Sequence, residues 1–211
     1  EIPVNVKKIL DGDVDLFVED RFPSLDGFNG NTNSEQSYLL LSRYDGDLQE
    51  AVVELIDLRN FEILHTWNPD IDAFNNLVEQ VDEFKYLERD ANNAREILRH
   101  PKLIKDGELL LSGWESPLRK IDACSNVIFQ NTHDTFHHSI ENDINGNIWV
   151  PSHAYPQTLP IEKVGRDIRA NGGFDDDAIV KLSTDGEILF EKSVSQIFID
   201  NGLEYLLISV G

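Results

Sequence analysis

Apolar and polar residues alternate along three segments of the chain, and a pair of turn-forming residues interrupts each of them. Alternation with a period of two is typical of a β-strand that buries one face, so each segment predicts two strands joined by a tight turn. The hairpins span residues 52–65, 118–129 and 178–190, with turns at Arg59 and Asn60, Ser125 and Asn126, and Asp185 and Gly186.

Two further kinds of strand are predicted ahead of these hairpins. One kind starts with histidine and leaves through a glycine turn, over residues 100–107 and 138–146. The other is a short apolar run that ends in serine, found at residues 38–42, 108–112 and 147–152, with a similar run starting at Tyr205. The repeating unit therefore has four strands. Four-stranded antiparallel units repeated along a chain are the blades of a β-propeller.

The pattern predicts an all-β fold, a β-propeller with about three blades and the start of a fourth, in one partial domain over residues 1–211. Propellers close with about four to eight blades. We therefore expect these residues to be the amino-terminal portion of a longer propeller, completed by further blades of the same propeller or by a second copy of the chain. The predicted blades span residues 12–67, 95–132 and 134–194, and the next begins near residue 203.

The spacing between the repeats leaves room for insertions. A short helical insertion is predicted near residues 70–98, starting at Asn68, Pro69 and Asp70. Residues 156–177 indicate a glycine-rich loop, and residues 195–202 a short helix or turn. The apolar positions of the helical insertion follow the spacing of a helix and are Ile71, Phe74, Leu77, Val78, Val81, Phe84 and Leu87.

Composition and charge exclude several classes of partner. The chain has 18 basic and 39 acidic residues, a formal charge of −21, so phosphate backbones and anionic lipid surfaces would be repelled. We expect neither nucleic acid nor a membrane as partner, and no run reaches the roughly 18 apolar residues of a membrane helix. Cys124 is the single cysteine, which excludes an intramolecular disulfide and a cysteine-cluster metal site.

Histidines concentrate in one part of the chain, which is the sharpest chemical signal present. Four of the six lie between His133 and His153, including His137 and His138. Histidine serves as nucleophile, acid or base near neutral pH and is also a common metal ligand. At the start of an innermost strand, His137 and His138 would face the channel of a propeller. His100 holds the equivalent place one blade earlier.

Each candidate also has a structural explanation. His137 and His138 stand beside Phe136 and Ile140, so they could equally be hydrogen-bonded residues packed between blades.

Three other residues are candidates for substrate binding. His153 ends a predicted strand near Tyr155, where a pocket-lining role and a structural role are equally open. Arg43 follows the first recurring serine at a blade end, where a surface ion pair would explain it as well.

No metal or cofactor is predicted. His133 and His137 are four residues apart and would share a face only on a helix, whereas the segment has the pattern of a strand. The segment 143–147, which starts at Asp143, loosely resembles the start of a calcium loop, but an Asn-Gly turn between strands explains it. The sequence carries no dinucleotide or P-loop fingerprint.

Several of these segments together resemble the arylsulfotransferase (aryl-sulfate sulfotransferase) family. The resemblance rests on His137 and His138, residues 143–153 and residues 177–190, and extends upstream through residues 42–48 and 53–58. It covers the chain from about Tyr38 to its end, with Ser139 where the family commonly has aspartate. The family has a six-bladed propeller, in agreement with the repeat pattern.

The resemblance implies transfer of a sulfuryl group from an aryl sulfate to a phenolic acceptor through a sulfated histidine, without a nucleotide donor or another cofactor. It implies a catalytic role for His137 and His138 and places the nucleophile in a later blade, so these residues alone are expected to be inactive. It also implies a periplasmic or extracellular location. The residues expected to bind substrate are His100, His153, Tyr155 and Arg43.

Two other functions stay open at this point. One is a non-catalytic propeller module for binding or assembly. The other is a metal-dependent propeller hydrolase, which would need a cluster of carboxylates and amides in the channel.

Overall fold

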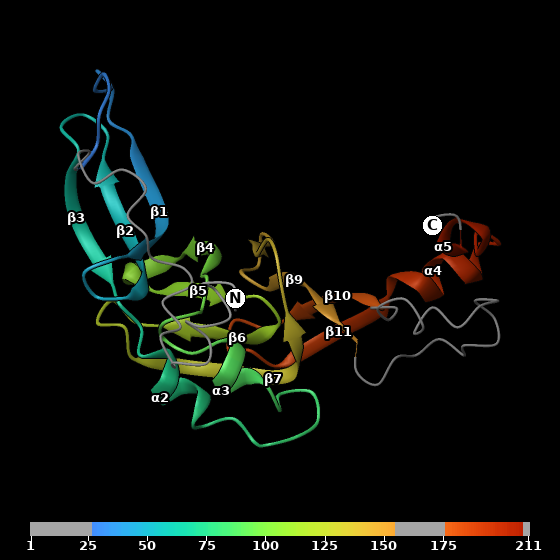
Figure 1. The fold of residues 1–211 in the computed structure, drawn as a ribbon. Coiled ribbons are helices and arrows are strands. Elements are labelled where there is room, and N and C mark those ends of the chain that lie inside the picture. Colours follow the sequence, from blue (N-terminus) through green and yellow to red (C-terminus); the bar gives the residue numbers. More distant parts are fainter. Residues whose placement is uncertain (1–26, 155–175, 209–211) are drawn as a thin grey trace, which may run out of the picture.

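The described part of the protein is built mainly from antiparallel β-sheets. A computed structural model describes residues 27–154 and 176–208. One sheet of three strands lies at one end of the molecule, a larger sheet forms the middle, and two short helices lie at the other end (Figure 1). The predicted all-β class is therefore confirmed. The start of the predicted 12–67 blade, Tyr155 and most of the predicted 156–177 loop lie outside the described residues.

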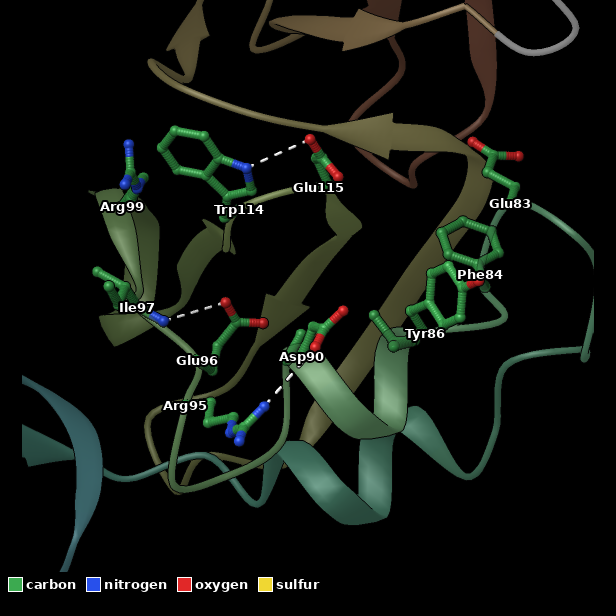
Figure 2. Close-up of a pocket in the computed structure, with 12 residues that line it drawn as sticks. Glu83, Phe84, Tyr86, Asp90, Arg95, Glu96, Ile97, Arg99, Trp114 and Glu115 are labelled. Carbon is green, nitrogen blue, oxygen red and sulfur yellow. Dashed lines mark hydrogen bonds and ion pairs between the residues drawn. The ribbon is translucent and has the colours of Figure 1, made fainter. Parts of the chain in front are cut away.

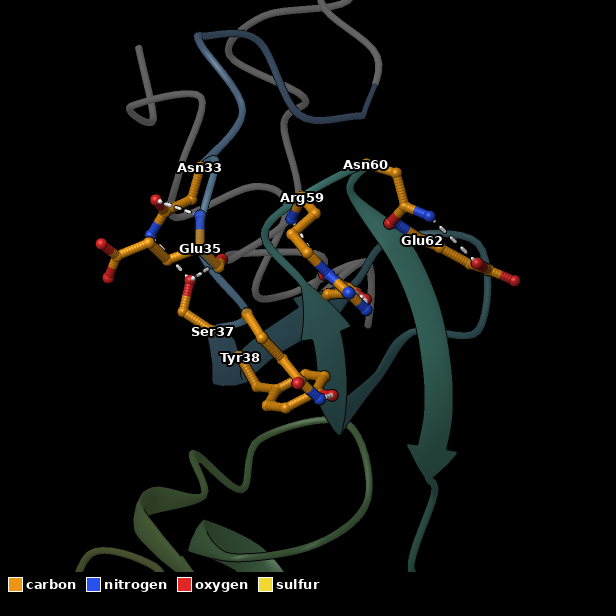
Figure 3. Close-up of polar contacts among 9 residues, drawn as sticks. Asn33, Glu35, Ser37, Tyr38, Arg59, Asn60 and Glu62 are labelled. Carbon is orange, nitrogen blue, oxygen red and sulfur yellow. Dashed lines mark hydrogen bonds and ion pairs between the residues drawn. The ribbon is translucent and has the colours of Figure 1, made fainter.

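The three-stranded sheet confirms the first predicted strand and hairpin. Its strands are β1 (Tyr38–Asp45), β2 (Glu50–Asp57) and β3 (Glu62–Trp67), paired antiparallel in that order. The turn between β2 and β3 is held by side chains. Arg59 folds back onto the carboxylate of Asp57, and Asn60 bonds Glu62, as Figure 3 shows.

The larger sheet consists of two four-stranded runs. The first run comprises β4 (Arg99–Leu103), β5 (Leu109–Ser112), β6 (Ser116–Ile121) and β7 (Val127–Phe136). The second run comprises β8 (Glu141–Asn142), β9 (Ile148–His153), β10 (Asp177–Leu182) and β11 (Ile188–Ser193). Neighbours in each run pair antiparallel, as the repeat predicts. The runs join where Thr135 and Phe136 of β7 pair with β9.

The two runs repeat the same backbone geometry at their starts. His100 and His138 both have left-handed backbone angles, with φ of 44° and 60°. Gly107 and Gly146 end the two segments. Their φ angles of 79° and 83° lie in the left-handed region, where glycine is favoured. The equivalence of the two histidine positions is therefore a property of the backbone as well as of the sequence.

Two apolar clusters hold the sheets together. One joins the three-stranded sheet to the first run and includes Val53, Trp67 and Leu111. The other joins the first run to the second and includes Leu118 and Val150. Because strands of neighbouring units contribute to the same cluster, no unit buries its apolar face alone.

The helical insertion forms two short helices instead of one long one. They are α2 (Ile71–Asn75), capped by the side chain of Asp70 as predicted, and α3 (Leu87–Asp90). Leu77 and Val81 lie between these two helices and are exposed, so the helical spacing predicted through these two positions does not form a helix there. Turns and helices share spacings of three and four residues, which explains the error. A 3-10 helix, η1 (Lys105–Gly107), links β4 to β5.

The predicted strand starting at Tyr205 is also wrong. The chain forms α4 (Val194–Asp200), which confirms the short helix predicted near 195–202, and then α5 (Tyr205–Ile208). Leu206 and Leu207 donate their backbone N–H groups to the carbonyls of residues 203 and 204, so the bonding is local. A run of four apolar residues cannot by itself distinguish a strand from a helix.

No helix in the described ranges combines the length and the apolar character that crossing a membrane demands.

Candidate functional site

The histidines predicted to carry chemistry meet in a small cavity, here called the histidine cavity, where the two runs join. Its volume is about 30 Å³. Four parts of the chain contribute: the start of β4, the loop between β5 and β6, the segment directly after β7, and the end of β9. The lining residues are Arg99, Gly113, Trp114, Glu115, His137, His138 and His153.

The imidazole rings are in contact with one another. Nδ1 of His137 lies 2.5 Å from Nδ1 of His138, and the ring centroids of His137 and His153 are 4.3 Å apart. Oδ1 of Asp177 lies 3.3 Å from Nε2 of His137 and 3.5 Å from Nε2 of His153. The two Nδ1 atoms can hold only one proton between them, so one donates and the other accepts.

His137 is the buried centre of this group. It is 8% exposed, its backbone N–H donates to the carbonyl of Pro151, and its Nε2 has no hydrogen-bond partner in the part of the chain that the structure describes. Burial lowers the pKa of His137, and the neighbouring His153 lowers it further, while Asp177 opposes both. The imidazole is therefore neutral at pH 7. His138 is exposed and accessible from solvent.

Arg99 supplies positive charge to the histidine cavity. Its guanidinium carbon lies 4.0 Å from the centroid of the Trp114 ring, a cation–π contact. Its Nε is buried without a hydrogen-bond partner in the described ranges, and its charge helps to lower the pKa of the nearby Glu96. A fixed guanidinium with unused donors can bind an anion.

A larger pocket, here called the insertion pocket, adjoins the histidine cavity. Its volume is about 410 Å³, and it lies between the helical insertion and the β5–β6 loop (Figure 2). It shares Arg99, Trp114 and Glu115 with the histidine cavity. Phe84 and Tyr86 add two aromatic rings to its lining. The volume is in the range of ordinary small-molecule sites.

Two carboxyl groups of the insertion pocket have raised pKa values. Burial raises the pKa of Glu83 to about 7, with a contribution from the charge of Asp134. Burial also raises the pKa of Glu96 to about 7, and Arg119 opposes that change. Arg119 is fully buried, with Nη1 3.9 Å from Oε2 of Glu96, and burial lowers its own pKa to about 10. Both carboxyls can therefore exchange protons near neutral pH.

The structure brings some of the predicted site residues together and leaves others apart. His137, His138 and His153 all line the histidine cavity. His100 is exposed and lines neither pocket. Arg43 lies on β1, where its guanidinium bonds Glu54 at 2.7 Å and 2.9 Å and also bonds a neighbouring aspartate. Tyr155 lies outside the described residues.

Sequence analysis missed three residues of this site: Arg99, Trp114 and Asp177. Asp177 is the cross-strand partner of His153 in the β9–β10 pairing. The sequence predicts both strands, but Asp177 can be placed opposite His153 only if the register between the two strands is known. Arg99 precedes the predicted strand start at His100, so extending that strand by one residue would have included it.

Two groups in the described ranges combine ligand atoms suited to a metal ion. The ligand atoms of His137, His153 and Asp177 all lie within 4.8 Å of one another. The same is true of a second group made of His133, Asp134 and Glu191. His133 and His137 belong to different groups.

Comparison with known proteins identifies a family. A search of the curated proteins finds no match. Among solved structures, a protein of unknown function from Bacteroides caccae is 12% identical, with a TM-score of 0.37, and the alignment covers 80% of this chain and 71% of that one. The family model described as Arylsulfotransferase (ASST) matches residues 100–210, which is more than half of the chain and includes all three histidines of the cavity. This chain belongs to the arylsulfotransferase family.

Proposed function

We propose that the protein transfers a sulfuryl group from an aryl sulfate to a phenol and that the two four-stranded runs are blades of a β-propeller. Family membership supports the reaction class. The repeated four-stranded runs, which share their backbone angles at His100 and His138, support the blade assignment. Further blades would come from the same propeller or from a second copy of the chain.

One observation carries the proposal: a cationic Arg99 and three histidines converge on one cavity in a chain of net charge −21. A sulfate ester is an anion and would be repelled by most of this surface. The mouth of the histidine cavity, where Arg99 and the exposed His138 lie, is a place that can bind it. Donors aimed at the charge that develops during transfer are a large source of catalysis.

Each group has a role in this proposal. Arg99 and the exposed His138 bind the sulfuryl oxygens. His137 orients His138 through the 2.5 Å contact between their Nδ1 atoms. The bond from sulfur to the aryl oxygen breaks as a histidine nitrogen of a later blade bonds sulfur, and the phenolate leaves. In the second half, the acceptor phenol loses its proton, its oxygen bonds sulfur, and the sulfur–nitrogen bond breaks.

The insertion pocket would hold the aryl ring. It opens beside the histidine cavity and shares Trp114, whose ring is 58% exposed. An aromatic substrate could stack on this ring while its sulfuryl group reaches Arg99. Glu83 or Glu96, with pKa values of about 7, can accept the proton of the acceptor phenol. The location that fits this function is periplasmic or extracellular.

The test measures release of a coloured phenolate from a chromogenic aryl sulfate by the natural polypeptide, with a phenol as acceptor. We expect Arg99→Ala and His138→Ala to lower kcat/KM by about 100-fold to 1,000-fold, the usual effect of losing a group that stabilises developing charge. Lys105→Ala, an exposed change on η1, is the matched control.

Two results would contradict the sulfuryl-transfer proposal. If the natural polypeptide shows no turnover, the protein is a binding or assembly module and not a transferase. If it turns over aryl sulfate and Arg99→Ala and His138→Ala match the wild type, the reaction takes place elsewhere.

A further inference from the structure

We propose that His137, His153 and Asp177 form a binding site for a divalent transition-metal ion such as Zn²⁺. Two imidazoles and one carboxylate are a ligand set that zinc and related ions use in proteins, usually with a position left open. His153 and Asp177 lie opposite each other at one end of the β9–β10 pair, and His137 directly follows β7, so the fold itself assembles the set.

The spacing of the ligand atoms supports this assignment. A tetrahedral zinc ion with bonds of about 2.0–2.1 Å holds neighbouring ligand atoms about 3.3–3.4 Å apart. Oδ1 of Asp177 lies 3.3 Å from Nε2 of His137 and 3.5 Å from Nε2 of His153. All three ligand atoms lie within 4.8 Å of one another, so the two histidine nitrogens would have to approach by no more than about 1.5 Å to reach tetrahedral spacing.

His137 provides a second observation. Its Nε2 is buried and has no hydrogen-bond partner among the described residues, with Oδ1 of Asp177 3.3 Å away, although its Nδ1 contacts His138. An unsatisfied buried polar atom costs about 1–3 kcal/mol. A metal ion bound at Nε2 would satisfy this atom. A ligating histidine commonly bonds a partner through its other ring nitrogen, and His138 fills that place.

The backbone holds the three ligands in register. His153 and Asp177 are direct partners across the β9–β10 ladder. The N–H of His137 donates to the carbonyl of Pro151, two residues before His153. Asp177 is 55% exposed, which leaves a route for an ion from solvent. The histidine cavity has room for about one water molecule as a fourth ligand.

The second group of possible ligands is less suited to a metal ion. Nε2 of His133 already bonds Glu191 at 2.8 Å, and Asp134 accepts a hydrogen bond from Ser152. An ion there would have to displace bonds that exist. A substitution in this second group therefore serves as a control for substitutions in the proposed site.

The experiment measures Zn²⁺ binding by calorimetry to the natural polypeptide after treatment with a chelator. We expect one Zn²⁺ per chain and no comparable binding of Mg²⁺, which prefers an all-oxygen site. Asp177→Asn and His153→Ala should weaken binding at least about 100-fold, and His138→Ala about 10-fold to 100-fold through its contact with His137. His133→Ala is the matched control and should bind as the wild type does. Circular dichroism confirms that each variant is folded.

The results separate this proposal from the sulfuryl-transfer proposal, on which it does not rest. Zinc binding without aryl sulfate turnover supports the metal site and removes the transferase. Failure of the wild type to bind Zn²⁺, or equal binding by Asp177→Asn and His153→Ala, overturns the metal site. If His133→Ala loses Zn²⁺ binding and Asp177→Asn keeps it, the ion binds at the second group, and the proposed site is overturned.

Discussion

The buried carboxyl of Glu96 should make the stability of the protein depend on pH in a direction opposite to that of a typical surface acid. Glu96 is 2% exposed, and burial raises its pKa from 4.5 to about 7. The folded state therefore holds the proton more tightly than the unfolded state. This carboxyl contributes its full stability below pH 4.5, and the contribution is lost as pH rises to about 7.

The magnitude follows from the two pKa values. The difference between 4.5 and about 7, at 1.36 kcal/mol for each pH unit, gives a loss of roughly 3 kcal/mol. Arg119 stays protonated over this range because its pKa is about 10. In Glu96→Gln the amide does not titrate, so this component of the pH dependence should disappear.

The assay is urea unfolding of the wild type and of Glu96→Gln between pH 5 and pH 8. We expect the free energy of unfolding of the wild type to fall relative to that of the variant by about 2–3 kcal/mol across this range. The two proteins are compared by the slope of the free energy of unfolding against pH, because the variant also loses the attraction to Arg119, which changes its absolute stability. Glu88→Gln on α3, an exposed glutamate, is the control and should keep the wild-type slope.

Parallel pH profiles for the wild type and Glu96→Gln would refute the reasoning. Such a result would mean that Glu96 is ionised in the folded protein with an ordinary pKa, and that the attraction of Arg119 balances the effect of burial.

Three further changes test the packing around the site. Gly113→Ala would place a methyl group 1.7 Å from Oε1 of Glu96, so we expect a loss of about 1–3 kcal/mol in urea unfolding, and an unchanged midpoint would contradict the close approach. Ser193→Ala removes the cap of α4 and a 2.8 Å bond to the buried Asp176, and should cost about 1–2 kcal/mol, measured as a lower thermal midpoint. His138→Gly should be about 1 kcal/mol more stable than His138→Ala, because glycine tolerates the φ of 60°; equal stability would show that this angle relaxes at no cost.

Local patterns predicted most of the strands because a strand that buries one face must alternate apolar and polar residues. The segment 178–190 became β10 and β11, with Gly186 in the turn at a φ of 87°. The same rule failed at Tyr205, where four apolar residues in a row fit a helix as well as a strand. It also failed at Leu77, which follows the spacing of a helix but lies in an exposed turn.

The candidate site was predicted in part. His137, His138 and His153 are close in sequence and at strand ends, so their clustering could be inferred from the chain alone. Asp177 joins them only because β9 and β10 pair in one register, with Asp177 opposite His153. A shift of one residue would turn this side chain to the other face of the sheet.

The sequence alone determined the fold class, the strand order within each repeat, the acidic surface and the part of the chain that carries the histidines. These depend on composition and on neighbours a few residues away. Only the tertiary structure decided that Arg99 and Trp114 would join the histidines, that His100 would lie apart, and that Glu96 would be buried beside Arg119. Such contacts link residues far apart in sequence, and they depend on how whole strands and helices pack together.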